Sequence, residues 1–289
     1  MSAGQVVHGT ARSTHISRTW WGISAACLVA VIGLLFSIFA FVLVQGLPAL
    51  KPSLFIEPTH GIAGGLANAI VGTLLLVAIG LVLVIVIGLG TAIWTVEFAP
   101  AWAKRAIRFM VDVLAGVPSI VVGYFLYVAL VEEAGWGFSL IAGAMALAIF
   151  MLPYVVRAAD VALTNVPKML TEGAVALGAR PAMVVASIAF PYALPGILTG
   201  LLVATGIGLG ETAPLIYTAG WSNYMPTLHP THSPVGYLTY VVWTYISQPF
   251  AESHRLAYAA AALLMIFIFA TNLLARSFVE YKLNKHTSR

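Results

Sequence analysis

A long apolar run in the first third of the chain constrains its fold more than any other feature. Residues 66–96 contain no charged side chain and consist mostly of Leu, Val, Ile, Ala and Gly. At about 1.5 Å of rise per residue, a helix of about 20 such residues crosses the hydrocarbon core of a membrane. Further apolar runs accompany it, so the sequence predicts six membrane-spanning helices at residues 22–44, 66–96, 109–131, 137–156, 192–217 and 256–275.

Composition excludes an ordinary soluble domain. Charged residues make up 8% of the chain and hydrophobic residues 61%, whereas soluble domains carry about 25% charged residues. The basic residues are scattered, without the long basic run typical of nucleic-acid binding. The first apolar run is longer than the core of a signal peptide, so we predict a retained span. A single cysteine, Cys27, excludes an internal disulfide.

The distribution of basic residues predicts the orientation in the membrane. Six spans place both termini on one side, and cytoplasmic segments are enriched in Lys and Arg. With the N-terminus inside, twelve basic residues fall in inner segments and only two, Lys51 and Arg255, in outer segments. We therefore expect both termini in the cytoplasm.

The spans and loops divide the chain into four parts. They are a disordered cytoplasmic tail at 1–21, a first transmembrane helix with an external loop at 22–65, a core at 66–280 with a cytoplasmic loop at 157–191, and a cytoplasmic tail at 281–289. The short aromatic stretch 235–246 in the last external loop predicts an interfacial or re-entrant helix.

The cytoplasmic loop contains a predicted helix–break–helix knob. Thr171 can cap a helix start, and the Glu172 carboxylate favours the positive end of that helix. Gly178 can end this helix, and Pro181 can open the next one. These residue types suit a short segment that docks on another protein, although a surface hairpin without a partner would show them too.

The residues along this knob stand at a characteristic spacing. Glu172-Gly173-Ala174, then Gly178, then an Ile-Ala-Phe-Pro sequence ending at Pro191 match the order E-A-A-x3-G-x9-I-x-L-P. That order resembles the EAA loop of ABC-importer permeases. The resemblance implies that these five residues couple the chain to an ATPase.

The chain has no nucleotide-binding motif of its own. Gly173 and Gly178 have the spacing G-x4-G, but Ala179 and Arg180 follow where a P-loop has Lys and Ser or Thr. Without those residues there is no ligand for a phosphate group or for Mg²⁺. We expect no catalytic residue and no cofactor on this chain, with ATP and Mg²⁺ bound by a partner ATPase. The external histidine pair lacks a neighbouring carboxylate, so no metal site is predicted.

An acidic residue near the end of the predicted fifth span marks a second candidate site. Glu211 and Thr212 belong to the sequence Gly-Glu-Thr-Ala-Pro, whose Pro214 can kink a helix. A carboxylate at the centre of a span costs roughly 2.5–3.5 kcal/mol, so it usually faces the bundle interior or an aqueous path. Because a bare carboxylate repels an anion, we expect Glu211 to be paired with a cation or to act in gating. The alternative is a purely structural pairing.

Small residues recur at four-residue steps before this site. They are Gly196, Gly200, Ala204, Gly208 and Thr212. Such a ridge lets another helix approach closely. Packing within the chain and contact with another subunit are equally compatible with it.

Two further stretches combine charge with a possible helix break. Asp112 lies early in the predicted third span, and Gly-Val-Pro follows it before Ser119. A break there would leave free amides beside the Ser119 hydroxyl that could face an anion. Arg157 follows Pro153 in the fourth span, and its planar fork fits oxyanions. The alternatives are a kinked helix with Asp112 at the interface and an Arg157 anchor paired with Asp160.

Four motifs together resemble the PstA type of phosphate ABC-importer permease, from about residue 68 onward. They are L-A-G-V-P-S-I-V at 114–121, L-P-Y-V-V-R at 152–157, the EAA-like loop, and G-E-T-A-P-L at 210–215. The resemblance implies an all-α polytopic protein of the bacterial inner membrane with the type I ABC-importer permease fold. It implies a translocation region at Arg157 and Glu211, which we expect Asp112, Ser119 and Thr212 to line as well.

The same resemblance implies partners and a mechanism. The partners are a second permease of the PstC type, two cytosolic ATPases of the PstB type and an external phosphate-binding protein. The chain would be the non-catalytic subunit that moves phosphate inward by alternating access. Relatives often carry a basic residue just before Gly-Glu-Thr-Ala-Pro, but residues 205–209 are uncharged here. A cation for Glu211 would therefore come from another helix or subunit.

Other functions remain compatible with the sequence. A permease for phosphonate or sulfate would share most of these motifs. A non-transporting scaffold or sensor would keep the docking loop but carry no substrate. An intramembrane aspartyl protease would use Asp112 with Asp160, although neither residue has the Gly-x-Gly-Asp setting of such enzymes.

Overall fold

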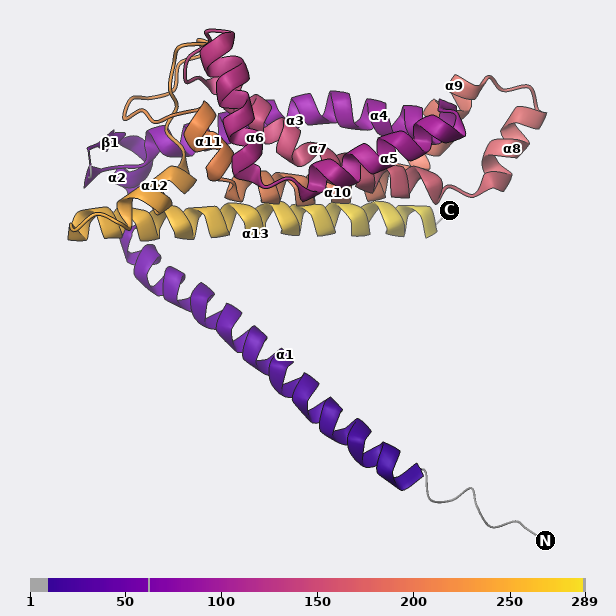
Figure 1. Cartoon of the computed structure of the whole chain (residues 1–289), viewed down its shortest axis with the longest axis horizontal. Helices are drawn as coiled ribbons and strands as arrows, with labels where there is room; N and C mark the ends of the chain where they lie inside the picture. The colour runs from indigo at the N-terminus through magenta and orange to yellow at the C-terminus, as the bar shows by residue number, and fades with distance from the viewer. Residues whose placement is uncertain (1–9, 62, 288–289) are drawn as a thin grey trace.

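The chain folds into helices, and several of the longer ones lie roughly along one long axis, while the N-terminal helix leaves the bundle at an angle (Figure 1). The structure, a computed structural model, describes residues 10–61 and 63–287. Its strands β1 (Thr59–His60) and β2 (Ala63–Gly64) form a short antiparallel pair. The α-helices are α1 (Thr10–Gly46), α2 (Pro52–Ile56), α3 (Ala67–Val84), α4 (Gly90–Ile93), α5 (Ala101–Gly116), α6 (Ser119–Leu126), α7 (Leu140–Thr164), α8 (Lys168–Ala176), α9 (Pro181–Val184), α10 (Phe190–Gly210), α11 (Ala213–Thr218), α12 (Leu238–Tyr245) and α13 (Ala251–Thr287).

The predicted all-helical membrane architecture is confirmed. The helical segments long and apolar enough to cross a membrane are, within the described ranges, Trp20–Ala49, Ala67–Phe98, Leu140–Thr164, Pro181–Gly210 and Ala251–Leu274. The sixth is a pair, Ala101–Gly116 and Ser119–Glu133, bent by 98°. Val117 and Pro118 have extended backbone angles there. Because proline removes a donor and disfavours helix in the residue before it, the predicted break forms a sharp corner between α5 and α6.

Helix α7 is the centre of the bundle. Its most apolar stretch is 61% buried, the largest share among the spans. It contacts α3, α4, α5, α10 and α11. The Ser139 hydroxyl caps its start by accepting a hydrogen bond from the Ala142 amide. Leu147 and Met151 are fully buried along its length, so α7 sets the positions of its neighbours.

The ridge of small residues brings α10 directly against α7. A Cβ atom added to Gly200 would lie 2.1 Å from the Cβ of Ala158, and one added to Gly196 would lie 2.9 Å from that of Ala162. Gly208 approaches Met151 in the same way. The ridge therefore serves packing within this chain, which was one of the two roles left open by the sequence.

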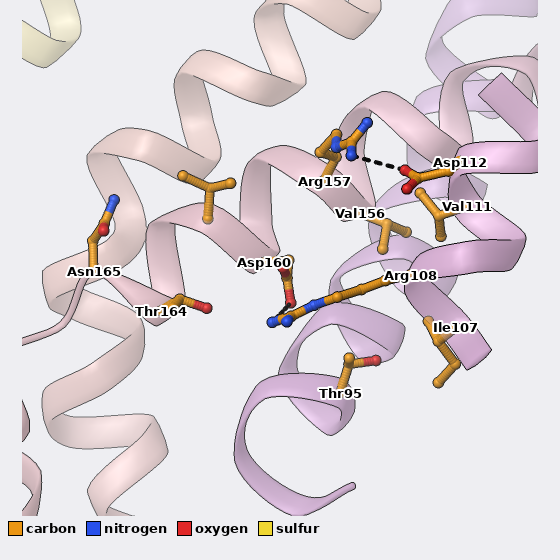
Figure 2. Close-up of a pocket in the computed structure, with 11 residues that line it drawn as sticks. Thr95, Ile107, Arg108, Val111, Asp112, Val156, Arg157, Asp160, Thr164 and Asn165 are labelled. Carbon is orange, nitrogen blue, oxygen red and sulfur yellow. Dashed lines mark hydrogen bonds and ion pairs between the residues drawn. The ribbon is translucent and has the colours of Figure 1, made fainter. Parts of the chain in front are cut away.

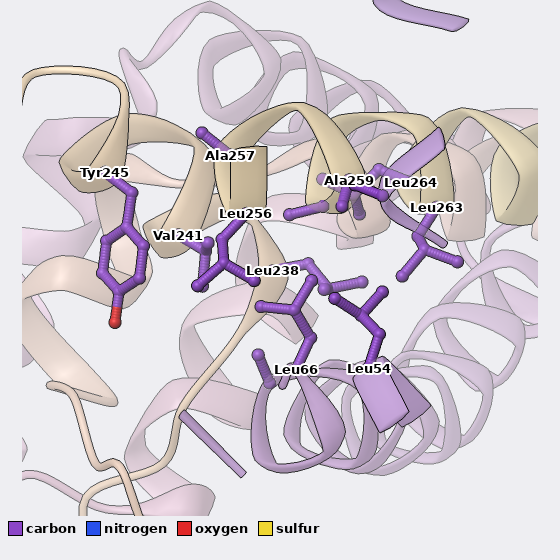
Figure 3. Close-up of a cluster of buried hydrophobic side chains, with 13 residues drawn as sticks. Leu54, Leu66, Leu238, Val241, Tyr245, Leu256, Ala257, Ala259, Leu263 and Leu264 are labelled. Carbon is purple, nitrogen blue, oxygen red and sulfur yellow. The ribbon is translucent and has the colours of Figure 1, made fainter. Parts of the chain in front are cut away.

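A buried polar network closes the end of the molecule that carries α12. The Asn68 side chain is fully buried, accepts a hydrogen bond from the Thr59 amide and donates to the Ser222 carbonyl. Beside it, Trp221 stacks on Tyr240 with ring centroids 4.4 Å apart. An apolar cluster ties this end to α13 through Leu54, Leu66, Leu238, Val241, Leu256 and Leu263 (Figure 3). The short helix expected at 235–246 is present as α12.

Both terminal segments are more helical than the sequence led us to expect. Helix α1 begins at Thr10, so residues 10–21 do not form a disordered tail, and residues 1–9 lie outside the described part. Helix α13 continues to Thr287, so the tail expected at 281–289 is helical as far as it is described. Neither segment contains Gly or Pro up to these limits, and nothing therefore interrupts the helix that begins in the span.

The bounds of the cytoplasmic loop and the fifth span also differ from the prediction. Helix α7 runs to Thr164, so Arg157 lies in its last turns rather than in a loop. The fifth span begins at Pro181 and ends at Gly210. Pro214 does not kink this helix, because Glu211 is already extended and Pro214 opens the separate helix α11.

Replacing Gly200 with Ala should destabilise the protein, because the new methyl group overlaps Ala158. We expect a loss of roughly 1–3 kcal/mol, seen as a lower unfolding midpoint of the detergent-purified protein. Gly206→Ala on the same helix is the matched control, since its Cβ would lie 3.8 Å from the nearest atom, Asn272 Nδ2. Both changes raise helix propensity equally, so equal midpoints would contradict the close packing.

Candidate functional site

The predicted knob is present at the end of the molecule where α13 terminates (Figure 1). Helix α8 ends at Ala176, and Gly178 has a φ of +85°, which glycine adopts without steric cost. Pro181 opens α9. The helix–break–helix prediction is therefore confirmed. The predicted start of the first helix is wrong, because α8 begins at Lys168, directly after Pro167. Thr171 does not cap this helix but lies inside it, where its hydroxyl donates to the Lys168 carbonyl.

The knob exposes its side chains instead of burying them. Helix α8 has no residue buried within the described chain, and Met169 and Leu177 are 83% and 90% exposed. Glu172 is exposed as well and lines a hollow with Glu97 and Val184. Two carboxylates beside apolar walls suit a basic side chain of another protein.

Four of the five predicted coupling residues lie together on the knob. Glu172, Gly173 and Ala174 are consecutive on α8, and Gly178 lies at the break that follows. Pro191 is separate, because it lies in the first turn of α10 beyond a π-helical segment, Val185–Ala189. Helical backbone runs through this point, since Ala189 and Phe190 have α-helical angles, so Pro191 lies inside the span next to a π-helical irregularity of its hydrogen bonding.

Four charged side chains meet between α5 and α7 (Figure 2). The Arg157 Nη2 atom lies 2.8 Å from Asp112 Oδ1, and the Arg108 Nη2 atom lies 3.0 Å from Asp160 Oδ1. All four line a hollow of about 400 Å³. Residues three and four positions apart share one face of a helix, so each helix presents one Arg and one Asp to the other. We define these four residues as the paired-charge cluster.

The pairing within this cluster differs from the alternative that the sequence offered. Arg157 is paired with Asp112 across two helices, not with Asp160 on its own helix. Sequence reasoning missed Arg108, which counted only as one of the inner basic residues. Its spacing of four from Asp112 was the signal that could have found it. Each aspartate has an arginine partner, whereas the two carboxylates of an aspartyl protease share a proton, so the protease alternative loses its support.

The remaining predicted residues meet where two helices are interrupted. Ser119 is the first residue of α6, and its side chain lies close to the Glu211 carboxylate just beyond α10. The Thr239 hydroxyl donates to the Glu211 carbonyl. Thr212 is half-buried beside them and precedes α11. Among the described residues no basic side chain forms an ion pair with Glu211, so the expected cation would have to come from a partner subunit.

A close backbone contact holds together the break before α6 and the break between α10 and α11. A Cβ atom added to Gly123 on α6 would lie 2.5 Å from the Cα atom of Pro214 on α11. Asp112 and Ser119 stand on either side of the corner at Val117. The paired-charge cluster and the Ser119–Glu211 contact therefore follow each other along the α5–α6 pair.

Comparison with known proteins identifies relatives along most of the chain. Residues 84–281 match the family described as binding-protein-dependent transport system inner membrane component. The phosphate transport system permease protein PstA 2 of Mycobacterium tuberculosis is 42% identical over 253 residues, which cover 88% of this chain and 84% of the relative. The phosphate transport system permease protein PstA of Haemophilus influenzae is 34% identical over 278 residues, which cover 94% and 96%.

Solved structures share the fold at lower identity. The inward-facing MetNI methionine ABC transporter aligns with a TM-score of 0.62 at 18% identity, over 74% of this chain and 96% of that chain. A bacterial ABC transporter involved in the import of the acidic polysaccharide alginate aligns with a TM-score of 0.63 at 14% identity, over 93% and 99%. These alignments confirm the type I importer permease fold. With the family match and the relatives above, they show that the chain belongs to the binding-protein-dependent transport system inner membrane components, among the permeases of the PstA type.

Proposed function

We propose that this chain is a transmembrane subunit of an ATP-driven importer of inorganic phosphate. The observation that carries the proposal is its 42% identity to a phosphate transport system permease over 88% of its length. The G-E-T-A-P-L motif and the arginine side chains of the paired-charge cluster support it. In this role the chain holds no cofactor and performs no covalent chemistry.

The paired-charge cluster supports a route for an anion along α5 and α7. Arg157 lies roughly 10 Å of helix rise from the end of α7 at Thr164. At such a depth in a membrane, charged groups face protein or water rather than lipid. We therefore assign the path of the anion to the surface between the paired-charge cluster on α5 and α7 and a second permease of the PstC type. Asp112 and Arg157 line it near the knob, and Ser119, Glu211 and Thr212 line it at the helix corner.

The knob supports coupling to a cytosolic ATPase of the PstB type. Its exposed apolar side chains and the Glu172 carboxylate, together with the Glu97 carboxylate that lines the same hollow, offer a contact surface that the chain itself does not cover. Closure of an ATPase dimer on ATP and Mg²⁺ would pull the knob and rock α7 and α10, which are joined to it directly. An external phosphate-binding protein would deliver the anion at the opposite end.

The proposed location is the bacterial inner membrane with both termini in the cytoplasm. The asymmetry of twelve inner against two outer basic residues supports this orientation. The end of α13 and the knob also lie at the same end of the molecule (Figure 1). That arrangement agrees with a cytoplasmic C-terminus, since the knob must reach a cytosolic partner.

Uptake of labelled phosphate tests the substrate. In bacterial cells that lack this gene and other phosphate transporters, restoring the gene should restore uptake at micromolar phosphate. Excess sulfate or phosphonate should leave that uptake unchanged. Uptake of sulfate or phosphonate instead would favour a permease for another oxyanion, and absence of any flux would favour a scaffold or sensor.

Replacing Glu172 with Lys should uncouple the chain from its ATPase. A reversed charge on the knob places like charges against a basic partner, so we expect at least about tenfold less ATPase in the purified complex. Phosphate uptake should fall with it while the permease remains in the membrane. Glu133→Lys is the control, because Glu133 is exposed at the end of the π-helical segment Tyr127–Glu133 and does not belong to the knob. Normal co-purification and uptake in the Glu172 variant would contradict docking through this residue.

Replacing Glu211 with Gln should impair transport while the complex still assembles. The amide keeps the size and polarity of the carboxylate beside Ser119 but cannot carry the charge. We expect uptake to fall severalfold at an unchanged amount of membrane-embedded protein, measured by immunoblot. Glu133→Gln provides the matched control. Uptake at the level of the unaltered protein would assign Glu211 a structural role only.

A further inference from the structure

The two ion pairs of the paired-charge cluster differ in how firmly they are held. The Asp160 side chain is only 17% exposed, and its contact with Arg108 also has hydrogen-bond geometry. The Asp112 and Arg157 side chains are 49% and 63% exposed. No hydrogen bond adds to their ion pair among the residues that the structure describes. Displacing Asp160 would strand a buried carboxylate, whereas water can solvate a displaced Asp112.

Arg157 is accessible from both sides of α7. It lines the hollow between α5 and α7 (Figure 2) and also a groove between α7 and α10. The hollow and the groove are both lined by two further residues, Val161 and Asn165, which carry no charge. The lining of the second groove is otherwise uncharged, with small residues such as Ala158 and Gly200. An anion on either side of α7 therefore meets the same guanidinium group.

The charges of the cluster are balanced, with two guanidinium groups and two carboxylates. An approaching anion is attracted by the arginines and repelled by the aspartates at similar distances. It gains a large net attraction only where a carboxylate moves away. The planar fork of an arginine binds phosphate oxygens in the same manner as carboxylate oxygens.

We propose that Asp112 occupies Arg157 in place of the transported anion, and that phosphate binds Arg157 by displacing the Asp112 carboxylate. Asp112 then determines specificity, because only an oxyanion that binds the guanidinium fork better than a carboxylate can replace it. When the anion leaves, Asp112 returns and prevents rebinding. The inference rests on the proposed function, since it takes phosphate as the substrate.

Equilibrium binding of labelled inorganic phosphate to the purified complex of this chain with its partner subunits, in lipid, tests the exchange. Asp112→Asn should tighten binding by roughly three- to tenfold, because Arg157 loses its internal competitor. The same variant should release phosphate more slowly during turnover. Asp160→Asn is the matched control, since it changes the net charge of the cluster equally and should tighten binding much less.

Three results would overturn the exchange. If phosphate binding tightened equally in Asp112→Asn and Asp160→Asn, the change in net charge alone would explain the result. Unchanged or weaker binding in Asp112→Asn would show that the carboxylate does not compete. The same comparison is made with Asp112→Ser where the Asn variant does not assemble. Absence of phosphate binding and uptake by the unaltered complex would instead overturn the proposed function, and the exchange with it.

Discussion

The contact between α7 and α10 is the interaction on which the rest of the structure depends. Helices in lipid gain little from burying apolar surface, so they associate through close packing. Gly196 and Gly200 allow this by leaving room for Ala162 and Ala158. Helix α7 then carries two members of the paired-charge cluster, and α10 ends at Gly210, directly before Glu211. A wider spacing between α7 and α10 would therefore move the paired-charge cluster away from the polar residues around Glu211.

The features that the sequence predicted have local causes. The spans follow from apolar length, and the knob follows from Gly178 and Pro181, whose backbone preferences act within a few residues. The corner before α6 follows from Pro118 in the same way. These positions were predicted without knowing any neighbour in space, and the structure places a break at each of them.

The features that the sequence did not predict depend on which face each helix turns toward its neighbours. Arg157 could reach Asp160 on its own helix or Asp112 on another, and only the facing of α5 and α7 decides between them. The Ser119 hydroxyl meets Glu211 because two interruptions fall side by side, although 92 positions separate them (211 − 119). The helix ends at Thr10 and Thr287 were missed for another reason, since polarity indicates where a span leaves the lipid and not where its helix stops.

The two ends of the molecule resist deformation to different degrees. Around Asn68, opening the structure would break hydrogen bonds of a fully buried amide and separate the stacked rings of Trp221 and Tyr240. Between α5 and α7, it would separate two ion pairs, of which the half-exposed Asp112–Arg157 pair can be solvated by water at little cost. Opening the structure at the end that carries the knob therefore costs less free energy than opening it around Asn68. In the proposed function, the end that carries α12 would act as the pivot, and α7 would act as a lever whose moving tip is the proposed ATPase contact.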